Sequence, residues 1–135
     1  MANDESMLVL LQRATHVTLQ VLGTELADLT ASEMNVLANL ADGQPRTVSE
    51  IGVAAGVRPT TLTGVLDRLA DRALLARAPR ARDRRAVEIS LTEAGARKAA
   101  RVTKAFAALE SRALDGVPQT AIAQARRVLT ALAAS

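Results

Sequence analysis

The stretch TVSEIGVAAGVRPTTLTGVLDRLADRALL, residues 47–75, decides the fold. Thr47 and Glu50 match a capping box, in which the hydroxyl and the carboxylate each bond a backbone N–H group at the start of a helix. The helix that they open stops near Gly56, and Pro59 stands where a second helix can begin, because the first residue of a helix needs no N–H donor. Two short helices joined by a tight turn that contains glycine follow the helix-turn-helix plan.

The second of these helices has one apolar face and one small, polar face. Four large apolar residues recur at helical spacing and are expected inside: Leu62, Val65, Leu66 and Leu69. The other side chains are expected to face outward: Thr60, Thr61, Thr63, Asp67, Arg68 and Arg72. Hydroxyl groups near the start of such a helix can bond phosphates or base edges, and a threonine methyl can contact a thymine methyl. An ordinary polar helix surface is the alternative interpretation of the threonines.

A run of arginines follows directly, since RAPRARDRR, residues 77–85, holds five Arg and one Asp in nine positions. The segments on either side, LLARAP and AVEISL, read as strands, because Val87, Ile89 and Leu91 alternate with smaller or polar residues. The run is therefore expected mostly at the tip of a hairpin. A solvated charged turn would have the same composition, but the position beside a helix-turn-helix favours contact with DNA, whose narrow minor groove attracts arginine.

Helices are expected on both sides of this central part. Residues 5–24 carry apolar side chains at alternating spacings of three and four, in a stripe wide enough to bury against more than one neighbour, including another subunit. Thr30 and Glu33 form a second capping box, for a helix that Gly43 ends. After the two strands, a long helix with Thr92 as its N-cap and a final helix are expected to run to the C-terminus.

Composition narrows the classes of function. The chain has 135 residues, of which 49% are hydrophobic, enough for one domain with its own core. Residues 58–85 hold eight Arg against three Asp, a net charge of +5, whereas residues 1–57 hold two Arg against seven acidic residues, a net charge of −5. This concentration of positive charge indicates a phosphate-binding surface.

Several chemistries are missing from the sequence. There is no Cys, which removes disulfides, thiolate metal sites and thiol redox sensors, and His16 is the single histidine, so no zinc site is expected. Phe106 is the single aromatic residue, which leaves no platform for stacking unpaired bases. No nucleophile with a base partner and no phosphate loop is present, so we expect neither an enzyme nor a cofactor. The apolar run at residues 7–11 is too short to cross a membrane, and a soluble cytoplasmic protein is expected.

The order of these elements and the residues in them resemble the MarR family of winged helix-turn-helix transcriptional regulators. The likeness covers roughly residues 29–96 without an insertion, and it includes LTASEMNVLANLAD, the helix-turn-helix stretch quoted above and DRRAVEISLTEAG. It implies a mainly α fold with a small β-wing and a single domain over residues 1–135. A winged-helix DNA-binding part at 29–91 would be flanked by dimerisation helices at 5–26 and 92–134.

The resemblance also implies how the protein would hold DNA. The helix that begins at Pro59 would lie in the major groove, and Arg85 in the wing would enter the minor groove. Asp83 would brace the wing by pairing with Arg77. The expected DNA contacts are Ser49, Arg58, Pro59, Thr60, Thr61, Thr63, Arg68, Arg80, Arg82, Arg84 and Arg85. Two of these have a plain alternative, because Ser49 could simply face water and Arg68 could pair with a neighbouring aspartate.

Three positions depart from the usual pattern of the family. Gly64 stands where an arginine or another polar residue is common, so one direct DNA contact is expected to be missing. Arg58 replaces the usual Ser or Thr N-cap, which removes a capping bond worth about 1 kcal/mol. Ala73 stands where glycine is usual, and costs on the order of 1 kcal/mol if the backbone there is left-handed.

The function expected from these observations is a homodimeric repressor that binds a pseudo-palindromic operator in double-stranded DNA. As the resemblance implies, a cleft between the terminal helices and the winged-helix part would bind a small aromatic or phenolic acid that weakens DNA binding. Met34 and Asn35 are candidates for lining that cleft. The alternative, from a different class, is a winged-helix module that binds an acidic protein partner and reads no DNA.

Overall fold

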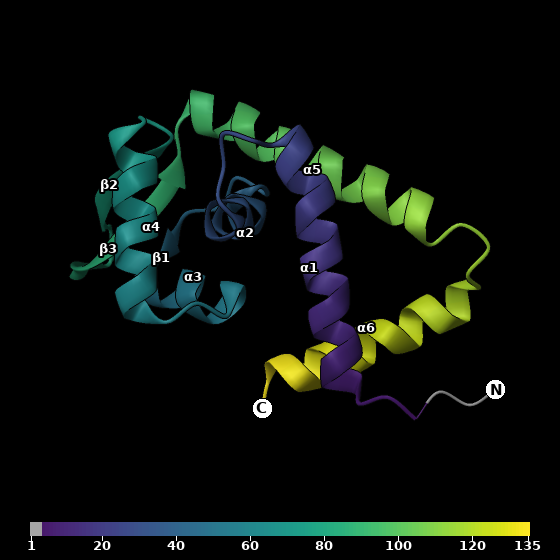
Figure 1. Ribbon diagram of the computed structural model, residues 1–135. Helices are drawn as coiled ribbons and strands as arrows, with labels where there is room; N and C mark the ends of the chain where they lie inside the picture. Colours follow the sequence, from purple (N-terminus) through teal and green to yellow (C-terminus); the bar gives the residue numbers. More distant parts are fainter. Residues whose placement is uncertain (1–3) are drawn as a thin grey trace.

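The computed structural model describes residues 4–135, apart from the side chain of Arg84, and shows six helices with one small antiparallel sheet. In chain order the elements are α1 (Met7–Glu25), α2 (Ala31–Leu40), β1 (Arg46–Thr47), α3 (Val48–Ala55), α4 (Pro59–Asp71), β2 (Leu75–Arg80), β3 (Asp83–Leu91), α5 (Glu93–Ala113) and α6 (Gln119–Ala133). The sheet, α2, α3 and α4 gather at one end of the molecule, and α5 leads away from them toward α6 (Figure 1). The predicted fold class, mainly α with a small β-wing, is confirmed.

The helix-turn-helix consists of α3 and α4 and starts where the sequence indicates. The Glu50 N–H donates to the Thr47 hydroxyl at 3.2 Å, and the Thr47 N–H donates to the Glu50 carboxylate at 2.9 Å. Gly56 ends α3 in a left-handed conformation with a φ of 66°. The apolar face of α4 is buried as predicted, in one core with the other elements of the winged-helix part: Leu62, Val65, Leu66 and Leu69 of α4, Leu37 and Leu40 of α2, Ile51 of α3, Ile89 of β3 and Val102 of α5.

The wing belongs to a three-stranded sheet, whereas the sequence indicated two strands. The strand order is β1-β3-β2, and in β1, which has only two residues, Arg46 stands opposite Ile89. So short a strand carries no alternating pattern that a sequence could show. The Arg46 guanidinium donates to both carboxylate oxygens of Asp42, at 2.8 and 2.6 Å, and holds the pKa of that carboxyl well below its usual range.

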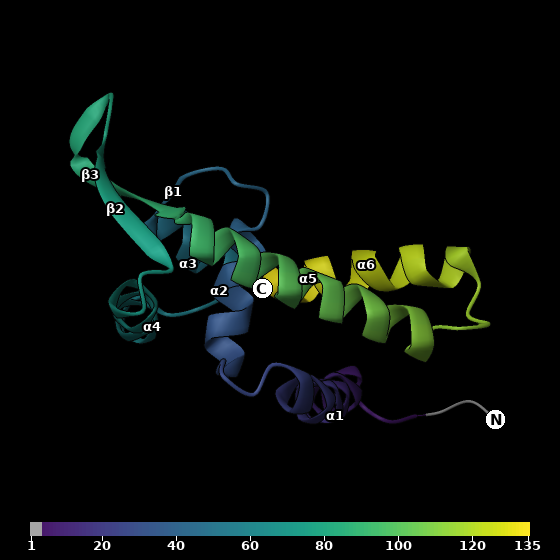
Figure 2. The same cartoon turned by 90° about the horizontal axis from the view of Figure 1, so that it is seen from above.

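The tip of the hairpin is shorter than expected. Only Ala81 and Arg82 form the turn, and β3 already begins at Asp83, so most of the arginine run lies on strands. The register shifts between Pro79 and Arg80. This end of the hairpin projects away from the helices (Figure 2), where no buried face imposes an alternation of apolar residues. For that reason the sequence pattern there looks like a loop.

The C-terminal end of α4 lies close to the starts of β2 and α5. Ala73 has a φ of 59°, so the left-handed backbone considered from the sequence is present. Gly95 approaches the Leu74 carbonyl so closely that a Cβ would lie 1.9 Å from its oxygen. The Thr92 hydroxyl accepts the Gly95 N–H at 3.0 Å and donates to the Ala73 carbonyl at 2.7 Å. Thr92 is therefore the N-cap that was predicted. Its hydrogen bond to Ala73 also links the start of α5 to the residues that follow α4.

The terminal helices leave much apolar surface uncovered. Leu22 is the one buried residue of α1, and α6 has none. Nine of the eleven large hydrophobic side chains that are exposed among the described residues lie in α1, in α6 or in the connection from α5 to α6: Met7, Leu8, Val9, Val17, Val21, Leu114, Val117, Val128 and Leu129. Within residues 4–135, none of the helices combines the length and the apolar character that a membrane-spanning helix needs.

Candidate DNA-binding surface

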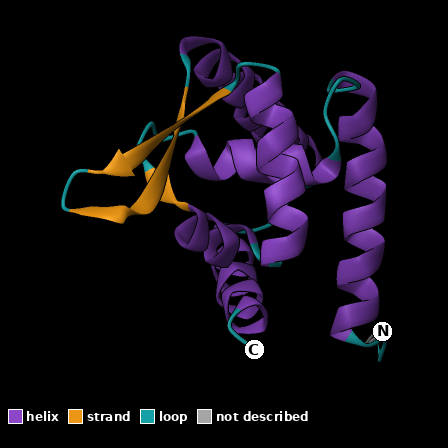
Figure 3. Ribbon diagram, turned by 90° about the vertical axis from the view of Figure 1, so that its left-hand side faces the viewer, coloured by secondary structure: helices purple, strands orange, loops and turns teal. Residues whose placement is uncertain are grey.

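One side of the molecule carries the exposed face of α4 and the wing. In Figure 3, which looks at this side, α4 runs across it and the wing extends toward one edge. The polar residues predicted to face outward from this helix are all exposed: Thr60, Thr61, Thr63, Asp67, Arg68 and Arg72. Arg58 is exposed at the N-cap of α4 and makes no side-chain capping bond, while the Thr63 hydroxyl donates to the Pro59 carbonyl at 3.0 Å. Hydroxyl and guanidinium groups thus share one accessible helix face.

A shallow apolar groove lies beside the start of α4. It has a volume of about 380 Å³, and Ser49, Val53 and Pro59 are among the residues that line it. Ser49 is exposed, as the prediction of a phosphate contact requires. Val53 is 83% exposed, more than any other large hydrophobic residue described, and the sequence analysis missed it. Its position two residues after the buried Ile51 places it on the opposite face of α3, which helical periodicity could have indicated.

Arg80 holds the wing to the helix-turn-helix. Its Nε donates to Glu88 of β3 at 2.9 Å, and its Nη2 donates to Glu50 of α3 at 2.8 Å. The hydrogen bond from the Thr47 N–H is the largest cause that keeps the pKa of the Glu50 carboxyl below its usual value. The positive charge of Arg80 lowers this pKa further. Arg80 was expected to contact DNA, and in the structure two carboxylate partners compete for its guanidinium with that contact.

Arg77 forms a second link between the wing and the helices. Its Nη2 donates to Asp67 of α4 at 2.6 Å. The predicted pair of Arg77 with Asp83 is not formed, because in the strand register Arg77 stands opposite Ile89, well away from the turn. The resemblance to the family implied this pair, and a likeness of motifs does not show how far the antiparallel register separates the two side chains. Exposed ion pairs contribute little stability, but those of Arg77 and Arg80 both join the wing to the helix-turn-helix.

The tip of the wing presents arginines to solvent. Arg82 lies in the turn and Arg85 on β3, and both are exposed. Asp83 accepts the backbone N–H of Arg85 on its Oδ1 at 3.0 Å, so it orients the backbone from which the Arg85 side chain extends. The side chain of Arg84, another predicted DNA contact, lies outside the described part of the chain.

The end of α4 is tied to α5 through the turn that follows α1. The Arg72 Nη1 donates to the Asp28 carbonyl at 3.0 Å, and its Nη2 lies 3.4 Å from the Asp28 carboxylate. Lys98 of α5 binds the same carboxylate and, as the largest cause, lowers the pKa of Asp28. The buried carboxylate of Glu33 lies 3.8 Å from Arg72 Nη1. These contacts fix the position of the exposed helix relative to α5.

Two neighbouring cavities lie where α1 and α5 approach each other and α2. One, of about 340 Å³, is lined by Met34 and Asn35 together with Thr15, Leu19 and Phe106. The other, of about 360 Å³, shares the last three of these residues and continues along α5. Phe106 is half-buried and contributes to both cavity walls. Neither cavity is lined by Lys, Arg or His within the described residues.

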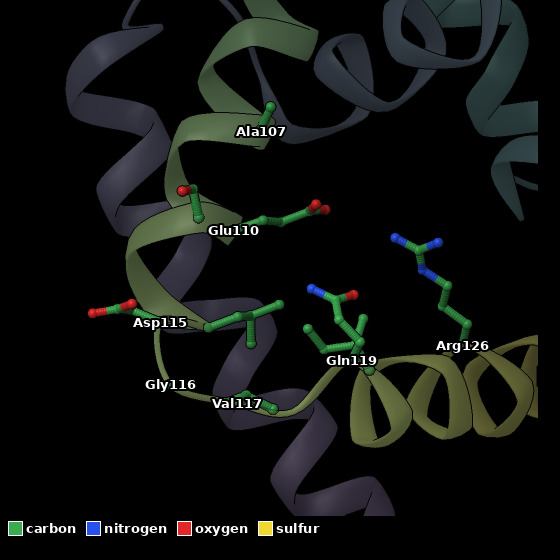
Figure 4. A pocket seen from close by; sticks show the side chains of 10 residues that line it. Ala107, Glu110, Asp115, Gly116, Val117, Gln119 and Arg126 are labelled. Atoms are coloured by element: carbon green, nitrogen blue, oxygen red, sulfur yellow. The ribbon is translucent and has the colours of Figure 1, made fainter.

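A third cavity, of about 450 Å³, opens between the end of α5 and the start of α6. In Figure 4 the side chains of Glu110 and Arg126 point into it from the two facing helices, while Asp115 points away. The cavity is therefore walled by opposite charges beside the apolar residues of the connection, Leu114 and Val117.

Comparison with known proteins identifies the family. A model described as MarR family matches residues 27–86. The HTH-type transcriptional repressor MdtR of Bacillus subtilis (strain 168) is 32% identical over 105 residues, which are 78% of this chain and 68% of that protein. The chain belongs to the MarR family.

Solved structures share the winged-helix fold of this MarR family chain. CouR from Rhodococcus jostii RHA1, solved bound to p-coumaroyl-CoA, matches with a TM-score of 0.85 at 26% identity, over 98% of this chain and 95% of that chain. BpsR of Bordetella bronchiseptica, whose DNA binding is regulated by 6-hydroxynicotinic acid, matches with a TM-score of 0.77 at 25% identity, over 93% of this chain and 99% of that chain. The chain is thus placed among transcriptional regulators with a winged helix-turn-helix.

As a member of the MarR family, the chain keeps the usual elements but arranges two details differently. The wing is held by Arg77 with Asp67 and by Arg80 with its two glutamates, where the resemblance implied a brace from Asp83. Gly64 leaves a gap in the side chains along α4, and an added Cβ there would meet only Arg68, at 3.5 Å.

Proposed function

We propose that this MarR family chain is a homodimeric repressor that binds a pseudo-palindromic operator in double-stranded DNA through α4 and the wing. The observation that carries the proposal is that α4 and the wing lie on the same side of the molecule (Figure 3), and that both carry exposed arginines. The contacts would be made by Ser49, Arg58, Pro59, Thr60, Thr61, Thr63, Arg68, Arg82, Arg84 and Arg85. The name of the related MdtR supports repression as the outcome of binding.

The dimer would form through the terminal helices, residues 5–26 and 92–134, while residues 29–91 bind DNA within a single domain over residues 1–135. The exposed apolar residues of α1 and α6 support this division, because surfaces with that much uncovered apolar area generally serve association. The cavity between α5 and α6, with Glu110 and Arg126 facing each other across it, offers space for a few side chains of a second copy (Figure 4). A two-fold dimer would place its two α4 helices on half-sites about 10–10.5 bp apart.

A small aromatic or phenolic molecule would regulate this dimer by binding in the cavities between α1, α2 and α5. Their walls combine apolar side chains with the Thr15 hydroxyl, the Asn35 amide and the Glu110 carboxylate, which suits a ring that carries a hydroxyl group. CouR and BpsR support the class of ligand, since aromatic molecules are named for both. A carboxylate on the ligand would need a cation from outside these cavity walls, such as one from the second protomer.

In this proposal the chain has no enzymatic activity and works in the cytoplasm, where it has access to the chromosome. The test is selection of bound sequences from random duplex DNA, followed by fluorescence anisotropy on the selected duplex. We expect an imperfect palindrome with half-sites one helical turn apart. A chain that selects no sequence would instead favour a winged-helix module that binds an acidic protein partner.

A further inference from the structure

Gly64 lies in the middle of the exposed face of α4. Residues four apart on a helix stand in one row, so Thr60, Gly64 and Arg68 follow each other along this face. Glycine weakens a helix relative to alanine, and nothing in the core requires it here. An added Cβ would meet a single atom within 4 Å, the Nη1 of Arg68 at 3.5 Å, which is an ordinary contact distance. The notable consequence of Gly64 is therefore the open space above it.

The Arg68 guanidinium lies beside this space. Long side chains on a helix point back toward its N-terminus, which brings Arg68 over the residue four positions earlier. Of the two aspartates that could pair with it, Asp67 is bound to Arg77 at 2.6 Å, and Asp71 makes no ion pair among the described residues. Among the residues that the structure describes, Arg68 makes no ion pair, and it is exposed. An arginine without a carboxylate partner thus lies along the row that faces outward from α4.

We propose that Arg68 reads a guanine in each half-site of the operator, from the place that Gly64 leaves open. This inference rests on the proposed function, in which α4 lies in the major groove. Because position 64 has no side chain, the guanidinium can lie close to the helix and face the base edges from the middle of α4. Its planar fork then donates two hydrogen bonds to the O6 and N7 atoms of guanine, the pairing that arginine makes most often with a base. The contact that Gly64 removes is replaced by one from Arg68.

The test compares the full-length chain with Arg68→Ala in selection from random duplex DNA. We expect the native chain to select a G·C pair at one fixed position of each half-site, and Arg68→Ala to lose that preference alone. Its affinity for the selected operator should fall about 5- to 150-fold for each of the two half-sites, the discrimination of one bidentate contact per protomer. Arg82→Ala is the matched control: it removes the same charge from the wing, so it should weaken binding to all sequences and keep the preference for guanine.

Substitutions at position 64 test the space itself. Gly64→Ala should keep the preference and raise the melting temperature, since its Cβ fits at 3.5 Å. Gly64→Gln should change the preferred base at the same position although Arg68 is present, because the longer side chain takes the place of the guanidinium. Circular dichroism and sedimentation check that each variant is folded and dimeric.

Three results overturn the inference. If Arg68→Ala weakens all sequences equally and keeps the preference for guanine, Arg68 contacts phosphate and does not read a base. If Gly64→Gln keeps the native preference, the open space has no role in recognition. A native chain that selects no sequence at all overturns the proposed function first, and this inference with it.

Discussion

The winged-helix part and the terminal helices differ in how they cover their apolar side chains. In the winged-helix part, α2, α3, α4 and β3 bury their apolar faces in one core, and only Val53 and Val87 remain exposed among the large hydrophobic residues. In α6 no residue is buried, although its apolar residues recur at helical spacing in the same way as those of α4. The winged-helix part therefore completes its core within one chain, whereas the terminal helices present a surface that a second chain can cover.

The two regions also differ in their charges. On the winged-helix part, charged side chains are joined in pairs that link separate elements, such as Arg77 with Asp67 and Arg80 with Glu50. The arginines at the wing tip and Arg68 of α4 make no such pair within the described residues. The ion pairs thus hold the elements in place, and the unpaired cations remain available to bind phosphate and bases.

The largest expected effect comes from placing a charge on the uncovered apolar face. Leu129→Glu should dissociate the dimer, because a carboxylate would have to be buried without a partner. With one α4 helix per particle, the affinity for the operator should fall about 100-fold or more, since the second half-site no longer contributes. Sedimentation and fluorescence anisotropy measure the two effects. Val53→Glu, the same kind of change on α3, should remain dimeric. If Leu129→Glu also remains dimeric, the apolar face of α6 is not the surface that a second chain covers.

The second prediction concerns the completed core. Leu37 is 0% exposed, and Leu37→Ala should lower the free energy of unfolding by about 2–5 kcal/mol, because the lost contacts leave a cavity. Urea denaturation at several protein concentrations measures this loss. The matched truncation, Leu129→Ala, should act on association. Its effect on the free energy of unfolding should therefore depend on the protein concentration, whereas the effect of Leu37→Ala should not. If the effects of both variants depend on protein concentration in the same way, the two regions do not differ in how their apolar side chains are covered.

The third prediction addresses the unpaired arginines. Arg85→Ala should reduce the slope of log affinity against log salt by about 1 for each protomer and weaken binding to sites with AT-rich flanks, because each wing loses one cation from the minor groove. Anisotropy titrations at several salt concentrations measure the slope. Arg112→Ala removes the same charge from the end of α5 and should leave the slope unchanged. Unchanged affinity and salt dependence in Arg85→Ala would show that the wing arginine does not touch DNA.

A smaller effect is expected at the junction behind the wing. Ala73 has a φ of 59°, and glycine adopts this conformation without the strain of a Cβ. Ala73→Gly should therefore stabilise the fold by about 1 kcal/mol, which corresponds to a rise in Tm of about 3 °C. Gly56 has nearly the same conformation, with a φ of 66°, so Gly56→Ala should lower the Tm by a similar amount. A fall in the Tm of Ala73→Gly would rule out strain at this position.

The smallest effect is expected at Asp83. Asp83→Ala removes the hydrogen bond to the Arg85 N–H, so the arginine is oriented less well although the wing becomes more positive. DNA affinity should fall about 2- to 10-fold, as for the loss of one hydrogen bond. Asp4→Ala, which changes the charge equally before the start of α1, should have no such effect. Tighter binding by Asp83→Ala would contradict an orienting role for the carboxylate.

The sequence alone determined what depends on residues close together in the chain. The capping boxes at Thr30 and Thr47, the N-cap at Thr92 and the apolar face of α4 were all predicted correctly, because a helix is organised by contacts three or four residues apart. The resemblance to the MarR family had the same local basis. It rested on short motifs that could be matched without an insertion.

Only the tertiary structure decided the contacts between distant residues. It added β1, and it replaced the predicted pair of Arg77 and Asp83 by the pair of Arg77 and Asp67. It also showed Arg80 bound between two glutamates from different elements. Such partners are set by strand register and helix packing, which bring together residues up to 70 positions apart, as in the pair of Lys98 and Asp28. Finally, apolar stripes of the same kind occur in α4 and α6, and only the folded chain shows that the first is covered and the second is not.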